Sequence, residues 1–139
     1  MTDATFAQTL VANMPDAVVY SDREGLIRYW NGGAARIFGH TAEEAIGRNL
    51  DLIIPPAQRA RHWEGFHETM RTGHSRYGSG EILSVPALRK DGTRLSIAFT
   101  IVPFTAADGT LNGIAAIIRD VTSQFEEMRA LRKERAALR

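Results

Sequence analysis

The chain has 139 residues, of which 44% are hydrophobic, and this is enough for one domain with an apolar core but too short for two. Its formal net charge of +1 argues against a general nucleic-acid surface and a highly acidic partner. The absence of cysteine excludes disulfides, thiolate metal sites and covalent thiol chemistry. The sequence has no apolar run long enough to span a membrane and no signal peptide, so we expect a cytoplasmic protein without a membrane partner.

The first part of the chain predicts a helix, a hairpin and two short helical segments. Apolar residues recur every four positions near the N-terminus, which indicates an amphipathic helix within residues 1–15. The apolar runs 17–20 and 26–30 flank turn-forming residues and predict two antiparallel strands. Glycines then interrupt the chain, which limits the segments 34–38 and 42–46 to brief helices.

The longest helical segment covers residues 59–73, between a pair of prolines that suits a first helical turn and a glycine that suits a helix end. On a helical projection, His62 falls in one arc with Phe66 and Met70, whereas His67 lies outside it. We therefore expect the His62 imidazole to face the interior and the His67 imidazole to face solvent.

The role of His62 stays open at this level. A lone histidine beside aromatic residues is more often a hydrogen-bonded polar group than a metal ligand, and both interpretations fit the pattern. We expect His40 to face solvent. His74 lies in the loop after Gly73, where it could reach the mouth of a cavity or be exposed, and exposure is favoured.

Three further strands are predicted in segments 81–88, 94–102 and 113–118. The middle one alternates strictly, with Leu95 and Ile97 on the face opposite to their polar or small neighbours. The resulting fold class is α+β, a five-stranded antiparallel sheet with helices on one face.

One face of the sheet is apolar and must be covered, and the long helix is the longest amphipathic element available to cover it. The side chains between them could interdigitate and leave no room, and a ligand held in a chamber there would meet few polar groups and would be small and apolar. The expected lining residues are His62, Phe66, Met70, Leu83, Ile97, Phe99, Ile101 and Ala116.

Short motifs along the chain occur in an order and spacing typical of one family. They are the segments 14–17, 22–25, 27–31, 38–39, 43–47, 89–92 and 119–122. Through them the chain resembles the PAS (S-box) sensory domains. The resemblance implies a ligand cavity between the sheet and its helices, with signals passed through the chain ends. The lack of cysteine excludes the adduct-forming flavin and the yellow-protein types of PAS chemistry.

Within this family the long helix is similar to that of heme-binding oxygen-sensor kinases. Pro55, Arg59 and His62, followed later by the segment 89–92, match the pattern of that subfamily. The resemblance places His62 as the axial ligand of a heme b iron. Leu83 occupies the place where oxygen-sensing members carry a distal arginine. A pocket with leucine there should retain oxygen poorly and suit nitric oxide or carbon monoxide better.

The C-terminal segment 123–139 contains neither glycine nor proline and is expected to be helical. Val121, Met128 and Leu131 lie at heptad spacing, which is typical of a short coiled coil. We therefore expect a PAS domain over 16–122, flanked by terminal helices that form a homodimer. The downstream effector would be a domain or partner outside this chain.

Two functions follow from this reading. The chain is either a sensory module that binds a small ligand or gas, with heme on His62 as its sharpest form, or a ligand-free module for dimerisation and protein interaction. No nucleophile elbow, phosphate-binding glycine loop or paired metal ligands occur in the sequence, so we do not expect an enzyme.

Overall fold

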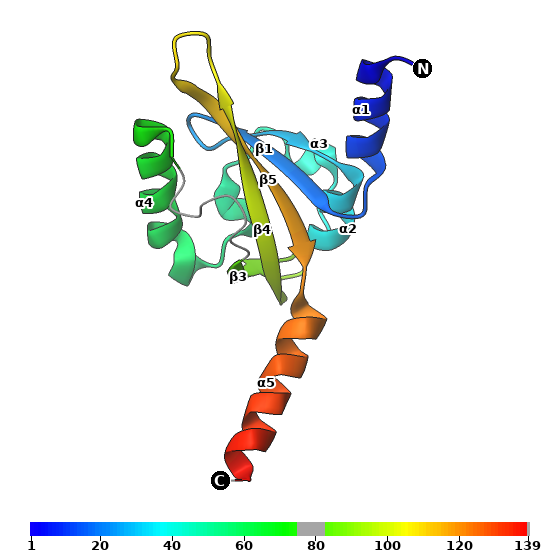
Figure 1. Cartoon of the computed structure of the whole chain (residues 1–139), viewed down its shortest axis with the longest axis vertical. Coiled ribbons are helices and arrows are strands. Elements are labelled where there is room, and N and C mark those ends of the chain that lie inside the picture. Colours follow the sequence, from blue (N-terminus) through cyan, green and yellow to red (C-terminus); the bar gives the residue numbers. More distant parts are fainter. Residues whose placement is uncertain (75–82, 139) are drawn as a thin grey trace.

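The structure is a computed structural model, and it describes residues 1–74 and 83–138 (Figure 1). The predicted α+β class is confirmed, with five antiparallel strands in one sheet. The elements in chain order are α1 (Asp3–Asn13), β1 (Ala17–Asp22), β2 (Ile27–Trp30), α2 (Gly32–Phe38), α3 (Ala42–Ala45), the 3-10 helix η1 (Leu50–Ile53), α4 (Pro56–Thr72), β3 (Leu83–Leu88), β4 (Arg94–Thr105), β5 (Leu111–Asp120) and α5 (Thr122–Ala137).

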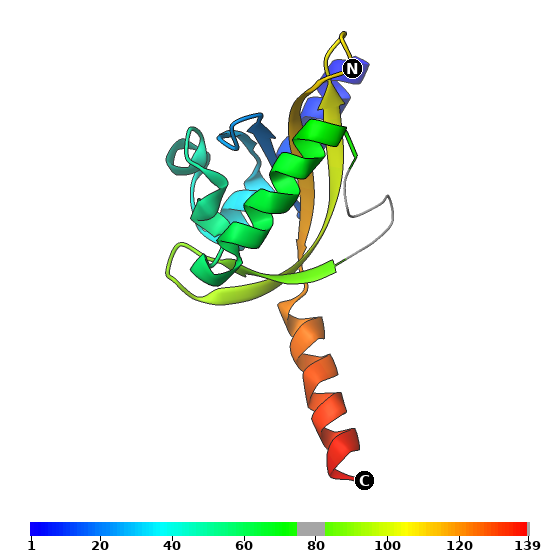
Figure 2. The ribbon, with the colours of Figure 1, turned by 90° about the vertical axis from the view of Figure 1, so that its left-hand side faces the viewer.

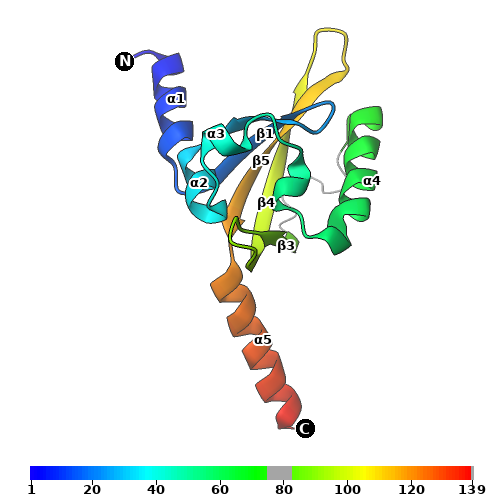
Figure 3. The same cartoon turned by 180° about the vertical axis from the view of Figure 1, so that it is seen from behind.

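The sheet has the order β2-β1-β5-β4-β3, which brings the two ends of the chain's folded part together. The last strand, β5, lies in the middle and pairs with β1 on one side and β4 on the other, so that Ile118 is opposite both Ala17 and Phe99. Helices α2, α3 and α4 lie on one side of this sheet, and α5 extends away from it (Figures 1 and 3).

The core lies between the sheet and these helices. The predicted alternation in β4 holds in part, because Leu95 and Ile97 are buried and Thr100 is exposed, but Ala98 on the opposite face is buried as well. α2 lies directly against β1, whereas α4 joins the same core through its side chains, chiefly Phe66. Figure 2 shows α4 lying in front of β4 and β5.

Strands β4 and β5 are longer than their sequence pattern predicts. β4 continues past position 102 to Thr105, where Pro103 pairs with Ile114 of β5. Within the described residues, the pairing of β4 with β3 ends at Phe99.

Helix boundaries follow the expected capping chemistry. α4 begins at Pro56, three residues before the predicted start, and ends at Gly73 with φ of +77°, a left-handed conformation that glycine adopts without strain. α2 begins at Gly32 because the Asn31 side chain accepts a hydrogen bond from the Ala34 amide. Among the described helices, none is long and apolar enough to cross a membrane.

Candidate functional site

The inner face of α4 carries the histidine on which the functional question depends. Phe66 and Thr69 are buried, and His62 and Met70 are half-buried beside them. His67 is exposed, so the predicted division of the helix into an inner and an outer face is confirmed. His74 is also exposed, as expected.

Trp63 anchors the first half of α4 to the rest of the domain. Its indole Nε1 donates to the Asp51 carboxylate of η1 over 2.8 Å. Its six-membered ring lies against the turn between β1 and β2, where a Cβ built on Gly25 would come within 2.2 Å of the ring. Arg59 adds a second link, from its Nε to the Ile54 carbonyl oxygen at 3.0 Å. The start of α4 is therefore held in place by two segments, η1 with its C-cap residue and the β1–β2 turn.

The His62 imidazole is enclosed by aromatic rings but has an unsatisfied nitrogen. Its ring centre is 4.8 Å from that of Trp63 and 6.0 Å from that of Phe66. The Nδ1 atom is buried and has no hydrogen-bond partner among the described residues. Burial lowers the pKa of His62 below its ordinary value of 6.5, the Asp51 charge opposes this shift, and His67 adds to it. The imidazole is therefore neutral at neutral pH.

Gln58 presents a second unsatisfied atom one helical turn before His62. Its Oε1 is buried and, like His62 Nδ1, finds no partner in the part of the chain that the structure describes. The sequence pattern did not identify this residue, because the predicted helix began at Arg59, one residue after Gln58, whereas α4 begins at Pro56. The four-residue spacing between Gln58 and His62 could have identified it, since residues four apart lie on the same helix face.

The other predicted chamber residues gather around the same core. Phe66 and Ile97 are buried in it. Partly buried apolar side chains pack against that core, and among them are Met70, Phe99, Ile101 and Ala116. The backbone of Leu83 pairs with Phe99, and its side chain lies outside what the structure describes.

These residues are chemically suited to a heme on the His62 side. A neutral imidazole is a standard axial ligand for heme iron, and burial keeps this one neutral. Gly65 follows on the same helix, and a Cβ built there would meet no atom within 4 Å. No group of three His, Asp or Glu side chains able to hold a bare metal ion occurs in the described ranges. The inner face of α4 thus offers one neutral imidazole among apolar and aromatic side chains.

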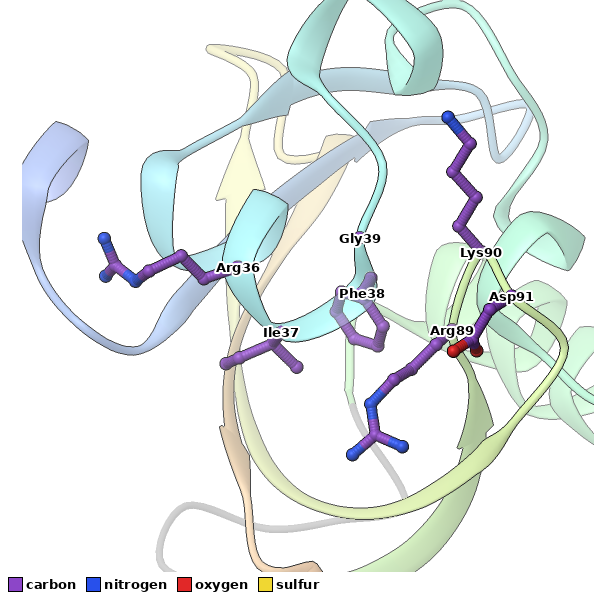
Figure 4. A pocket seen from close by; sticks show the side chains of 7 residues that line it. All are labelled: Arg36, Ile37, Phe38, Gly39, Arg89, Lys90 and Asp91. Carbon is purple, nitrogen blue, oxygen red and sulfur yellow. The ribbon is translucent and has the colours of Figure 1, made fainter.

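A separate pocket of about 460 Å³ lies between the end of α2 and the turn joining β3 to β4 (Figure 4). Its cationic side chains are engaged elsewhere: Lys90 Nζ bonds Glu44 at 2.5 Å, Arg89 lies 3.5 Å from Asp120, and Arg36 donates to a carbonyl oxygen. None of the predicted chamber residues lines this pocket. The lining residues are Arg36, Ile37, Phe38, Gly39, Arg89, Lys90 and Asp91.

The expectation that His40 faces solvent is wrong. Its side chain is half-buried, with its ring centre 6.3 Å from that of Trp30. The Trp30 indole donates to the His40 carbonyl oxygen over 2.9 Å, which holds the segment against the core. Burial lowers the pKa of His40 as well. The sequence could not reveal this, because the contact joins a strand to a loop ten positions away.

The junction of β5 with α5 is fixed by a compact set of hydrogen bonds. Thr122 Oγ1 bonds the Asp120 carboxylate at 2.5 Å and accepts from the Ser96 amide at 3.0 Å. The Val121 amide donates to the Ser96 carbonyl oxygen at 2.9 Å. The start of the C-terminal helix is therefore bonded to β4 as well as to the strand that precedes it.

The fold and this arrangement agree with a family match over most of the chain. The family model of the PAS fold matches residues 5–121, and the chain therefore belongs to the PAS family. Its structure is similar to the crystal structure of a PAS domain from Colwellia psychrerythraea, with a TM-score of 0.76 and 22% identity over 88% of this chain and 99% of that one. It is also similar to an RNA-binding light-oxygen-voltage receptor, with a TM-score of 0.75 and 17% identity over 96% of this chain and 37% of that one.

Relatives of known sequence are much longer proteins. The chain is 34% identical to an uncharacterized protein of Azorhizobium caulinodans over 85% of its own length and 16% of that protein's. It is 26% identical to the sensor protein FixL of Bradyrhizobium diazoefficiens, over 99% of this chain and 26% of that one. It is 26% identical to the oxygen sensor protein DosP of Escherichia coli, over 94% of this chain and 16% of that one. The chain is thus a PAS sensory domain of the kind typical of bacterial signal transduction, and it spans about a quarter or less of these relatives.

Proposed function

We propose that this PAS domain senses a small ligand or gas between α4 and the sheet. In the most specific version of this proposal, the domain binds a heme b through His62. The observation that carries this proposal is the neutral imidazole that α4 holds among aromatic rings on its inner face. A neutral imidazole beside an apolar core is a standard setting for an axial ligand of heme iron. The similarity to FixL and DosP, both named as sensors, supports the same assignment.

Within this proposal the chain's own residues bind and shield the cofactor. His62 would supply the axial nitrogen, and Phe66 and Met70 would cover the same side from α4. Ile97, Phe99, Ile101 and Ala116 would form the apolar wall, with Leu83 on the side opposite His62. Heme supplies an iron that binds diatomic gases. An apolar Leu83 offers no hydrogen bond there, so we propose that nitric oxide or carbon monoxide is favoured over oxygen.

An absorption spectrum of the purified protein mixed with hemin tests this directly. We expect a Soret band for the wild type and for His67→Ala, because His67 is exposed on the outer face of α4. We expect the band to be lost or strongly weakened in His62→Ala. The two substitutions are five residues apart on one helix, so His67→Ala controls for any general effect on α4.

The proposal has a clear contrary result. Absence of a Soret band in all three proteins would remove heme while leaving a sensor of another small apolar ligand. A band of equal strength in His62→Ala would assign the heme to another site. Circular dichroism of each variant establishes that the domain is folded in both cases.

A second function is favoured by the terminal helices. α1 and α5 contain no buried residue, and their exposed apolar side chains include Phe6, Leu10, Met128 and Leu131. We propose that these helices pair two copies of the chain and pass the signal to an effector domain or partner protein. If neither heme nor another ligand binds, dimerisation and protein interaction remain as the function of the module.

A further inference from the structure

We propose that Gln58 is the positioning residue for His62, accepting a hydrogen bond from His62 Nδ1–H and thereby leaving the Nε2 lone pair free for a ligand. The proposal rests on the proposed sensing role of His62, because the residue would position the imidazole for that role. It adds a residue that no sequence motif of the chain singles out.

The two atoms are complementary and lie on one face of one helix. Gln58 Oε1 accepts only, and Nδ1 of a neutral imidazole donates when it carries the ring proton. Both atoms are buried, and neither has a hydrogen-bond partner among the described residues, so the bond between them is the proposed one. Residues four apart are neighbours on a helix, and side chains lean towards its N-terminus, so the His62 ring is directed towards the turn that holds Gln58.

Joining the two atoms would require the Gln58 side chain to turn its carbonyl oxygen towards His62 Nδ1. The terminal torsion of a glutamine side chain is broad, so its amide group rotates at low cost. One hydrogen bond would then satisfy both buried atoms, whereas separately each carries a desolvation penalty. No other pair of atoms in the described part of the chain is left in this state.

The acidic group that acts on His62 already has a partner on one oxygen. Asp51 Oδ1 accepts the Trp63 indole N–H at 2.8 Å and lies 3.9 Å from Arg59 Nε. The other charged or titratable group that acts on His62 is His67, which is exposed on the outer face of the helix. Among the described residues, Gln58 Oε1 is the buried side-chain acceptor that has no partner.

The chemical consequence is a fixed tautomer. A histidine that ligates a metal commonly donates its other ring N–H to a carbonyl or carboxylate oxygen, which sets the ring orientation and raises the basicity of the ligating nitrogen. A glutamine carbonyl oxygen can act in this way without adding a charge to an apolar site. With the proton on Nδ1, Nε2 carries the free lone pair and is the nitrogen that can ligate iron or accept a hydrogen bond.

The test is the ring-proton position of His62, read from two-bond ¹H–¹⁵N correlations of ¹⁵N-histidine-labelled protein near about pH 8, where histidine is neutral. The signal is assigned by its loss in His62→Leu. We expect the Nδ1–H form in the wild type and its loss in Gln58→Leu, which removes the acceptor. Gln58→Glu keeps an acceptor oxygen and should keep the Nδ1–H form. Glu64→Leu places the same new side chain on the exposed face of α4 and should change nothing.

Hemin titration provides the second readout. Loss of a partner of this kind typically weakens metal binding by about 10- to 100-fold, so we expect that loss in Gln58→Leu and wild-type affinity in Glu64→Leu. A His62 ring with its proton on Nε2 in the wild type, or an Nδ1–H form that persists in Gln58→Leu, would overturn the proposal. If no protein binds hemin, the heme assignment fails, and the tautomer measurement still decides the role of Gln58.

Discussion

At the scale of single residues, His62 and Asn31 are two polar groups among apolar side chains, and they differ in how their hydrogen bonds are met. Asn31 is 4% exposed and uses both its amide oxygen and its nitrogen, bonding four backbone groups. The His62 Nδ1 has no such partner in the described structure. Satisfied polar groups fix a fold, whereas an unsatisfied one marks a place where binding has something to gain.

We expect the stability of the domain to depend on pH through His62. Burial lowers its pKa below the 6.5 of the unfolded chain, so the unfolded chain takes up a proton at a higher pH than the folded one. The contribution of this group to the free energy of unfolding is complete above pH 6.5 and is lost as the pH falls. Urea unfolding at about pH 8 and about pH 5.5 measures this difference.

His62→Leu provides the comparison for that experiment. Carboxylates elsewhere in the domain also respond to acid, and they are the same in both proteins. We expect the free energy of unfolding to fall less between the two pH values in His62→Leu than in the wild type. An equal fall in both proteins would mean that the imidazole titrates alike in the folded and unfolded chains.

Asn31 should be one of the most costly polar positions to replace. We expect Asn31→Ala to lower the free energy of unfolding by about 2–4 kcal/mol, because it leaves several buried backbone groups without partners. Asn49→Ala is the matched control, since Asn49 is exposed and only caps a short helix through the Asp51 amide. Its cost should be about 1 kcal/mol. Chemical denaturation measures both variants. Similar losses of unfolding free energy in Asn31→Ala and Asn49→Ala would contradict the role assigned to Asn31.

At the scale of elements, the helix and strand periodicities gave most of the fold. The period of 3.6 placed His62 and Phe66 on the inner face of α4, and the period of two placed Leu95 and Ile97 in the core. These patterns succeed because one face of each element must leave water. The order of strands in the sheet is not contained in such patterns, since it depends on contacts between segments far apart in the chain.

The candidate site was predictable to the same extent. Phe66 and Ile97 belong to one apolar cluster, as their faces indicated. The bond from Trp63 to Asp51 could not be predicted, because it joins a helix to a preceding turn whose position only the folded chain defines. Gln58 could have been placed beside His62 from the same helical spacing, since the two are four residues apart. It lies one residue before the predicted helical segment and was therefore left out.

The β1–β2 turn and α4 are in direct contact, and one substitution measures what that contact is worth. In Gly25→Ala, the new Cβ would lie 2.2 Å from the Trp63 ring, and the residue has a φ of +82°. Gly109→Ala is matched to it, since Gly109 has a φ of +88° and no atom within 4 Å of the added Cβ. Both should lose about 1–2 kcal/mol for the left-handed backbone.

The difference between the two alanine variants reports the displacement of Trp63. We expect Gly25→Ala to be less stable than Gly109→Ala in thermal unfolding by about 1–3 kcal/mol, the range typical of overpacking. The indole fluorescence should also change in Gly25→Ala alone. Equal melting temperatures would mean that α4 moves away from the turn at no cost.

At the scale of the whole molecule, the two terminal helices lie outside the core but are bonded to it. α1 is tied through the Val11 carbonyl oxygen, which accepts from Asn31 Nδ2 at 2.8 Å, and α5 through Thr122 and Ser96. Phe125 and Met128 on α5 are 39% and 51% exposed. A helix with such residues and no buried side chain gains stability mainly by packing against another helix.

Self-association through α5 should therefore respond to a charge on its apolar side. We expect Met128→Glu to shift the protein from dimer towards monomer in analytical ultracentrifugation, because a carboxylate would have to leave water in the interface. Lys133→Glu is the control, because it changes the charge of the same helix by one unit more at an exposed heptad position away from Met128 and Leu131, so we expect little effect on association. A wild-type protein that is monomeric at all concentrations would contradict the assignment.

The bonds between Ser96 and the start of α5 also determine the direction in which that helix leaves the sheet. α5 contains 16 residues and is therefore about 24 Å long. A change of about 5° in its direction at Ser96 displaces its last turn by about 2 Å. Side chains lose contact over separations of about that size. A shift of β4 too small to disturb its own hydrogen bonds is thus enough to rearrange whatever lies beside the far end of this helix.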